Sequence, residues 1–151
     1  MTTIAFRDGI IAADTRISYR TFHNGTKNKI ARCGRFYVAL AGMGHLRRPL
    51  EQWAAAGCDP DNLPEVLVEN RKEFSALFLD SDGRIFEFDE HGLLEIEANY
   101  TAIGSGGFFA MGAMAHGANA VEAVKAASLH DLASGGEIHH AHFSSLTSLF
   151  S

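Results

Sequence analysis

A threonine stands directly after the first methionine, in the segment Met1-Thr2-Thr3-Ile4. If Met1 is removed, Thr2 carries a free α-amino group beside its own hydroxyl. A hydroxyl is a poor nucleophile until a base takes its proton, and an α-amine, which titrates at about 7.7 to 8.0, can accept that proton near neutral pH. The chemistry that this suggests is an N-terminal threonine hydrolase. Many chains begin with Met-Thr, so other residues must support the hypothesis.

Two charged residues could tune such an amine. Asp14 ends an apolar segment, and Lys29 stands just before another one. A nearby cation depresses the pKa of an amine, so Lys29 would keep the Thr2 amine neutral and able to act as a base, while Asp14 would hold the lysine. Taken singly, each residue is more typical of a surface charge at the end of a strand.

Two glycine-containing turns extend the candidate site. Gly42 follows the apolar residues 36–41, where a glycine either makes a simple turn or lets a backbone N–H approach a substrate carbonyl and stabilise an oxyanion. The loop Gly104-Ser105-Gly106-Gly107 lacks the lysine of a P-loop and the later acid of a dinucleotide fingerprint, which disfavours a phosphate site. Ser105 is better placed as a polar neighbour of the catalytic amine.

A carboxylate and a hydroxyl stand three residues apart in Asp131-Leu132-Ala133-Ser134-Gly135-Gly136. At this spacing, Asp131 and Ser134 would share one face of a helix. A helix end with a glycine stop explains the glycines but not the pairing. Both side chains are therefore candidate site residues.

Composition and charge limit the class of protein. The chain has 151 residues, of which 46% are hydrophobic and 21% charged, so we expect one globular domain over residues 1–151. A signal peptide and a run of about 18 apolar residues are both absent, which predicts a cytoplasmic protein with no membrane partner. The net charge of −5 argues against nucleic acid, since phosphate binding needs concentrated cations and Arg47-Arg48 is too small a cluster.

Neither cysteines nor histidines predict a metal site. Cys33 and Cys58 are far apart in the sequence and are expected to be reduced thiols. His139, His140 and His142 form the densest histidine cluster, but no carboxylate or cysteine stands at a convincing spacing, so no metal ligand and no cofactor is predicted. A metal site at these histidines is an alternative that the sequence leaves open.

The hydrophobic pattern predicts strands and helices in blocks. Asp8-Gly9 between the apolar residues 4–6 and 10–13 is typical of a hairpin. Blocks of strands and helices, in place of strict alternation, predict an α+β fold with antiparallel sheets between outer helices. Strands are expected near residues 4–6, 10–13, 29–31, 36–41, 74–79, 84–88, 93–96, 100–103 and 138–143, and helices near 45–56, 63–72, 108–117 and 120–132.

The predicted helices carry their own expectations. Residues 63–72 should be capped by Asp61 or Asn62, and Asn119 should cap residues 120–132. The Ala- and Met-rich segment 108–117 is expected to be buried. In the last helix we expect a common apolar side formed by Val121, Val124, Ala127 and Leu129.

Taken together, these residues resemble the proteasome β-subunit family, with a closer likeness to the compact bacterial branch that includes HslV. The likeness covers about residues 2 to 143 and is carried by the order and spacing of Thr2-Thr3-Ile4, Asp14, Lys29, Ala41-Gly42, Gly104-Ser105-Gly106-Gly107 and Asp131-x-x-Ser134-Gly135-Gly136. It implies a four-layer αββα Ntn-hydrolase fold and threonine-peptidase activity in a ring-shaped chamber.

The resemblance also implies roles for individual residues. Thr2 would be the nucleophile and, through its amine, the base, while Asp14 and Lys29 would tune it. The Gly42 N–H would donate to the oxyanion. The polar network around the amine would be completed by Ser105, Asp131 and Ser134.

Substrate would lie as an extra strand between the backbone near Ile17-Ser18 and that near Gly42. Ile17, Leu40 and Gly44 would help to shape the first specificity pocket. The implied partners are polypeptide substrates, further copies of the chain in a six- or seven-fold ring, single or stacked, and an AAA+ unfoldase.

The chain departs from the family in a shorter segment between Gly57 and Phe74 and in a short tail after Gly136. Because only Met1 precedes Thr2, a methionine aminopeptidase is expected to suffice for activation. Two alternatives stay open: a non-proteolytic ring subunit that retains Met1, and an Ntn amidohydrolase that acts on small amides.

Overall fold

Two antiparallel sheets form the centre of the computed structural model, which describes residues 2–19 and 22–144. The first sheet has the strand order β10 (Tyr100–Gly104), β1 (Thr3–Arg7), β2 (Ile10–Ala13) and β11 (His139–Ala141). The second has the order β5 (Ile30–Cys33), β6 (Phe36–Gly42), β7 (Phe74–Asp80), β8 (Ile85–Asp89) and β9 (Gly92–Glu95). A separate hairpin joins β3 (Arg16–Tyr19) and β4 (Phe22–Thr26).

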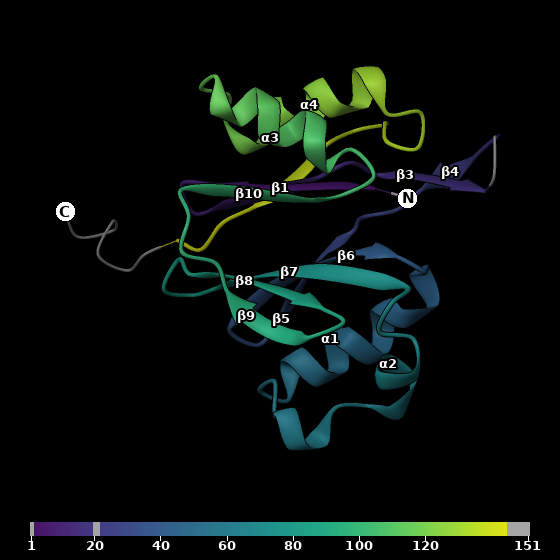
Figure 1. The fold of residues 1–151 in the computed structure, drawn as a ribbon, viewed down its shortest axis with the longest axis vertical. Coiled ribbons are helices and arrows are strands. Elements are labelled where there is room, and N and C mark those ends of the chain that lie inside the picture. Colours follow the sequence, from purple (N-terminus) through teal and green to yellow (C-terminus); the bar gives the residue numbers. More distant parts are fainter. Residues whose placement is uncertain (1, 20–21, 145–151) are drawn as a thin grey trace.

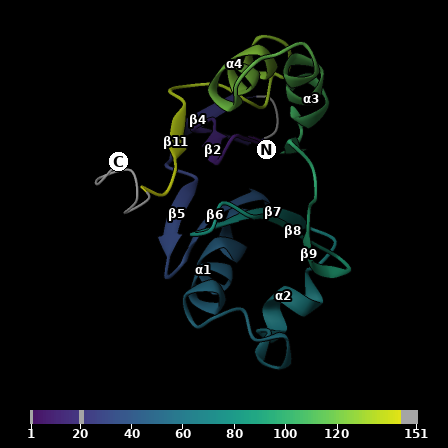
Figure 2. The ribbon, with the colours of Figure 1, turned by 90° about the vertical axis from the view of Figure 1, so that its left-hand side faces the viewer.

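The helices lie on the outer faces of the two sheets (Figures 1 and 2). The pair α3 (Gly107–Ala115) and α4 (Ala120–His130) covers the first sheet. On the far side of the second sheet lie α1 (Arg47–Ala55) and α2 (Glu65–Glu69), with the short 3-10 helices η1 (Gly44–Leu46) and η2 (Pro60–Asn62). The α+β class with antiparallel sheets, predicted from the block order, is confirmed.

The first hairpin positions the N-terminus. Asp8 and Gly9 have φ angles of 52° and 75°, as a two-residue turn that follows the strand twist requires. The register pairs Ile4 with Ala13 across β1 and β2, and Thr3 with Gly104 across β1 and β10. Thr2 and Thr3 therefore lie between the end of β2 and the end of β10.

Side chains that alternate along the strands of the first sheet pack into two different hydrophobic cores, one on each face. Ile4 and Ile11 face the second sheet, where they pack in a cluster with Leu77 and Leu79. The residues between them are small: Ala5 and Ala12 face α3 and α4 and pack against Ala110, Met114 and Val124. Small side chains on that face let the two helices approach the sheet closely, and both faces of the sheet are covered.

An aromatic cluster fills the core between the second sheet and α1. The Trp53 ring meets Phe88 edge-on at 5.5 Å, and Phe74 stacks on Phe88 at the same centroid distance. Phe36 and Phe78 meet edge-on at 5.6 Å. Such contacts add to the hydrophobic burial and hold β6, whose last residue reaches the candidate site.

The second predicted helix is shorter than expected. It covers only Glu65–Glu69, and its N-cap is Pro64, not Asn62 or Asp61. Asp59 instead accepts a hydrogen bond from the Asp61 N–H at 3.0 Å and caps the preceding 3-10 turn. Pro64 is extended, so the earlier turn cannot continue into the helix.

Two predictions about helix faces were wrong. Phe108 and Phe109 of α3 are 93% and 46% exposed, so this helix is not buried all round but only on the side of Ala110 and Met114. Leu129 of α4 is 82% exposed. At about 100° per residue, Leu129 lies roughly opposite Ala127 and far from Val124 on the helix surface, so the three cannot share one side.

The histidine segment forms a strand only over His139–Ala141. Within residues 2–19 and 22–144, no group of three potential metal ligands comes together. Across the same part of the chain, no helix combines the length and the apolarity needed to cross a membrane.

Asn119 caps α4 as predicted, and it does so in a capping box. Its side chain accepts from the Glu122 N–H at 2.8 Å, and the Glu122 side chain accepts from the Asn119 N–H at 3.0 Å. We expect Asn119→Ala to lower the free energy of unfolding by about 1 kcal/mol, because the Glu122 N–H loses its acceptor. Urea denaturation measures this, with the exposed Asn99→Ala as the control; an equal loss in both variants would contradict the capping role.

Candidate active site

Thr2, Asp14 and Lys29 meet where the two sheets come together. Thr2 precedes β1, Asp14 follows β2, and Lys29 precedes β5 of the other sheet. The Thr2 hydroxyl donates to Asp14 Oδ1, and Lys29 Nζ lies 2.5 Å from Thr2 Oγ1 and 3.0 Å from Asp14 Oδ1. All three are buried, with exposed fractions of 3%, 0% and 4%. The hydroxyl of Thr2 thus contacts both members of a buried ion pair.

Burial lowers the pKa of Lys29, because an ammonium group loses hydration in the interior. The charge of Asp14 and its hydrogen bond raise this pKa, but they offset the burial only in part. Arg47 lowers it further, and Asp131 raises it slightly. Lys29 therefore gives up its proton more readily than an ordinary lysine.

Backbone donors hold the Asp14 carboxylate. The Thr3 N–H donates to Oδ1 at 3.0 Å, and the Gly135 N–H donates to Oδ2 at 2.9 Å. Sequence reasoning missed both donors. A polar pair at the start of a fully apolar strand was a signal for Thr3, whereas Gly135 was considered only as a helix stop.

A second polar cluster adjoins the first. The hydroxyls of Ser105 and Ser134 both donate to Asp131 Oδ2, at 2.6 and 2.5 Å. Thr3 Oγ1 lies 2.7 Å from Ser134 Oγ, and since Ser134 gives its only hydroxyl proton to Asp131, Thr3 must be the donor. Ser105 Oγ also lies 3.3 Å from the Thr2 carbonyl oxygen. The cluster therefore reaches the backbone of Thr2.

The geometry that joins Asp131 to Ser134 is not the predicted one. Helix α4 ends at His130, Asp131 is extended, and the Ser134 N–H closes a turn on the Asp131 carbonyl at 3.1 Å. The two side chains pair across this turn and not along a helical face. Burial alone would raise the pKa of Asp131, but hydrogen bonds from Ser105, Ser134 and the Ala133 N–H outweigh it, so the pKa lies below its ordinary value.

Gly42 ends β6 beside Thr2 and has a φ of +128°, which side chains rarely adopt. A Cβ there would collide with the Glu73 carbonyl oxygen and come within 2.7 Å of the Phe74 Cα. Only glycine therefore lets the end of β6 lie this close to Glu73 and Phe74 at the start of β7.

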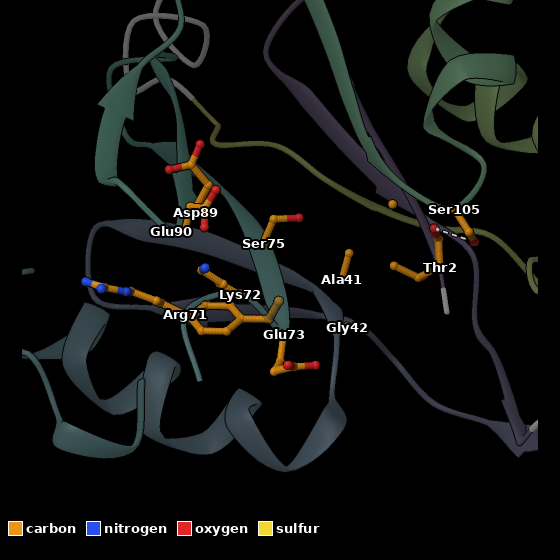
Figure 3. A pocket seen from close by; sticks show the side chains of 12 residues that line it. Thr2, Ala41, Gly42, Arg71, Lys72, Glu73, Ser75, Asp89, Glu90 and Ser105 are labelled. Atoms are coloured by element: carbon orange, nitrogen blue, oxygen red, sulfur yellow. Dashed lines mark hydrogen bonds between the residues drawn. The ribbon is translucent and has the colours of Figure 1, made fainter. Parts of the chain in front are cut away.

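Two hollows lie beside Thr2, and Thr2 and Gly42 line both. The larger, of about 590 Å³, runs from Ser105 and Thr2 past Gly42 towards Asp89 and Glu90 (Figure 3). The smaller, of about 280 Å³, lies towards β3 and the start of α1. An extended chain that passes over Thr2 would therefore have a recess on each side.

The residues predicted to shape the first specificity pocket fall into the smaller hollow. Ile17, Leu40 and Gly44 all line it. Ser18 pairs with His23 in the β3–β4 hairpin through its backbone, but its side chain lies outside the described part of the structure. Sequence reasoning did not place Arg47 here, where it also lines the wall.

Comparison with solved structures identifies the fold. BPH from Thiobacillus denitrificans in complex with epoxomicin superposes with a TM-score of 0.73 at 24% identity, over 95% of this chain and 99% of that chain. A second structure of this BPH gives 0.74 at 23% identity, over 95% and 98%. Eukaryotic HslV from Trypanosoma brucei gives 0.70 at 18% identity, over 95% and 99%. No protein-family model and no curated protein sequence matches the chain.

At these identities the likeness establishes the fold. The chain has the fold of BPH and HslV over almost its whole length. The resemblance to HslV-type proteasome β-subunits that the sequence predicts is confirmed at this level.

The lowered pKa of Asp131 makes a testable contribution to stability. The unfolded chain takes up this proton near the ordinary value of 3.8, and the folded chain takes it up only at lower pH. The stabilisation is therefore complete above that value and is lost as the pH falls through the folded pKa. We expect the difference in free energy of unfolding between the natural chain and Asp131→Asn to shrink as the pH falls from about 6 to about 3.

Urea denaturation at a series of pH values measures this difference. Asp61→Asn, which removes a carboxylate at an exposed position outside this cluster, serves as the control. A pH-independent difference for Asp131→Asn would show that the hydroxyl network does not favour the carboxylate.

Proposed function

We propose that the chain is an N-terminal threonine endopeptidase, a single proteasome-like domain in which Thr2, freed by removal of Met1, is the nucleophile. The observation that carries the proposal is the position of Thr2 Oγ1, 2.5 Å from Lys29 Nζ and hydrogen-bonded to Asp14 in a buried site. The fold shared with HslV supports it. We also infer that the two sheets and their outer helices are the four-layer αββα sandwich of the Ntn hydrolases.

In the proposed reaction, Thr2 Oγ attacks the scissile carbonyl carbon while the Thr2 amine takes the hydroxyl proton. The Gly42 N–H donates to the oxyanion that forms. The C–N bond then breaks, the leaving amine receives the proton, and an ester to Thr2 remains. The Thr2 amine then activates a water molecule, which hydrolyses this ester. Hydrolysis restores Thr2 and releases the carboxylic acid.

Lys29 and Asp14 are proposed to set the electrostatics of the first step. The Lys29 ammonium, 2.5 Å from Thr2 Oγ1, favours negative charge on that oxygen and disfavours protonation of the amine. Asp14 holds Lys29 at 3.0 Å and keeps the cation in place. Burial strengthens both effects, because water is largely excluded.

The second polar cluster is proposed to orient the new N-terminus. Ser105 lies 3.3 Å from the Thr2 carbonyl oxygen and is fixed by Asp131, which Ser134 also contacts. The cluster thus contacts the backbone of Thr2 through Ser105. We propose that these polar groups accept from the amine and direct its lone pair towards Thr2 Oγ.

Substrate is proposed to bind as an extended strand between β3, near Ile17-Ser18, and Gly42. The two hollows beside Thr2 would receive side chains on either side of the scissile bond. We further propose a cytoplasmic homo-oligomeric ring of six- or seven-fold symmetry, with an AAA+ unfoldase that supplies substrates. Because BPH is solved with epoxomicin, that compound is a suitable first ligand to test.

The proposal predicts that a trimmed sample, with loss of Met1 verified by intact mass, forms an adduct on Thr2 with an electrophilic peptide inhibitor. Thr2→Ala should form no adduct. It should lose peptidase activity by a factor on the order of 10³ or more, since the nucleophilic hydroxyl is removed. Peptide mapping and peptide turnover measure the two effects, with Thr101→Ala as a matched control in β10.

Three results would contradict the proposed endopeptidase. An adduct on another residue would show that Thr2 is not the nucleophile. Activity in material that retains Met1 would show that a free Thr2 amine is not the base. Thr2-dependent turnover of small amides with no turnover of peptides would instead assign an Ntn amidohydrolase.

A further inference from the structure

The smaller hollow beside Thr2 is strongly cationic. Its lining contains the residues Arg16, Lys27, Lys29 and Arg47, and no aspartate or glutamate from the described part of the chain. The larger hollow, on the other side of Thr2, is mixed, since Arg71 and Lys72 lie there with three carboxylates, Glu73, Asp89 and Glu90. The two sides of the candidate site therefore differ in the charge that they attract.

Two of the four cations already have partners near the pocket. Lys29 is paired with Asp14 at 3.0 Å. Arg16 Nη1 donates to the Leu132 carbonyl oxygen at 3.1 Å. Each of these two side chains therefore has a partner within the fold, although Arg16 Nε is buried without a hydrogen-bond partner among the described residues.

Arg47 shares an unpartnered Nε with Arg16 but, in the part of the chain that the structure describes, makes no contact like that of Arg16 with the Leu132 carbonyl oxygen. Its Nε is buried and has no hydrogen-bond partner among the described residues, and no described carboxylate lies within ion-pair distance of it. Burial lowers its pKa, and the charge of Glu51 one turn later offsets this only in part. A half-buried guanidinium without a partner is costly, and a carboxylate that arrived in the pocket would relieve that cost.

The charge of Arg47 acts within the candidate site. After burial, it is the group that most lowers the pKa of Lys29, and both residues line the smaller hollow. Arg47 begins α1, directly after the turn that follows Gly42. The position is rigid because the next turns of α1 are anchored by the buried residues Leu50 and Trp53.

We propose that this pocket selects an acidic side chain, and that Arg47, assisted by Lys27, binds the carboxylate of a glutamate or aspartate immediately before the scissile bond. The proposal rests on the proposed peptidase function, which makes this hollow the first specificity pocket. Ile17 and Leu40 supply apolar wall for the methylene groups of that side chain. A guanidinium can donate two parallel N–H bonds to the two oxygens of a carboxylate. The side-chain amide of glutamine has only one oxygen and cannot accept both bonds in this way.

Cleavage of three peptides that differ only in the residue before the scissile bond tests the selection. We expect kcat/KM for glutamate to exceed that for glutamine and for leucine by about tenfold or more, as for a charge-assisted contact. In Arg47→Gln the ratio of glutamate to glutamine should fall to within about threefold of unity, and Arg47→Lys should retain part of it. Arg48→Gln, a neighbouring exposed arginine outside the pocket, is the matched control and should keep the full ratio.

A binding measurement separates this inference from the peptidase mechanism. On the Thr2→Ala chain, fluorescence anisotropy should show that an acetylated peptide ending in glutamate amide binds about tenfold more tightly than one ending in glutamine amide, and Arg47→Gln should abolish the difference. If the chain shows this binding preference but no Thr2-dependent cleavage, the proposed carboxylate selectivity stands and the proposed peptidase function is wrong. The opposite outcome is Thr2-dependent cleavage with equal rates for glutamate and glutamine, or an equal fall of the glutamate-to-glutamine ratio in Arg47→Gln and Arg48→Gln. Either result would contradict the carboxylate selectivity while the peptidase function stands.

Discussion

The contact between Lys29, Asp14 and the Thr2 hydroxyl is the constraint on which the rest of the structure depends. A buried ion pair adds little to stability because both ions lose their hydration, so the surroundings must compensate them. The Thr3 and Gly135 N–H groups do so for Asp14, at 3.0 and 2.9 Å. The pair therefore exists at some cost to the fold, which is typical of a site kept for its chemistry.

The fold assembles this contact from both sheets. The β1–β2 hairpin brings Asp14 beside Thr3 in the first sheet, and Lys29 enters from the start of β5 in the second. The core that joins the sheets, which contains Ile4 and Leu77, consequently fixes the distance between the hydroxyl and the ammonium group. Gly42 and Arg47 belong to the same end of the second sheet and its first helix, so the proposed chemistry and the proposed selectivity share one rigid support.

Much of this arrangement could be predicted because the signals are local or are carried by residue order. Asp8-Gly9 predicts the hairpin, and the apolar run before Gly42 predicts β6. The turn that pairs Asp131 with Ser134 could not be predicted, since it depends on where α4 ends against the sheet. The same holds for the exposed Phe108 and Leu129, because a sequence does not show which apolar residues of a helix lack a neighbour. The place of Arg47 in a cationic pocket could not be predicted, because the other cations of the lining, Arg16, Lys27 and Lys29, come from other segments of the chain.

The most direct test of the account is a titration of Lys29 by NMR in a chain labelled at the lysine side chains, with Lys29→Arg to assign the signal. The account predicts that the pKa of Lys29 in the folded chain lies below its value in the same chain unfolded in urea, and that Asp14→Asn lowers it further. A pKa of Lys29 in the folded chain at or above the unfolded value would contradict the account, since burial would then not govern the lysine beside Thr2.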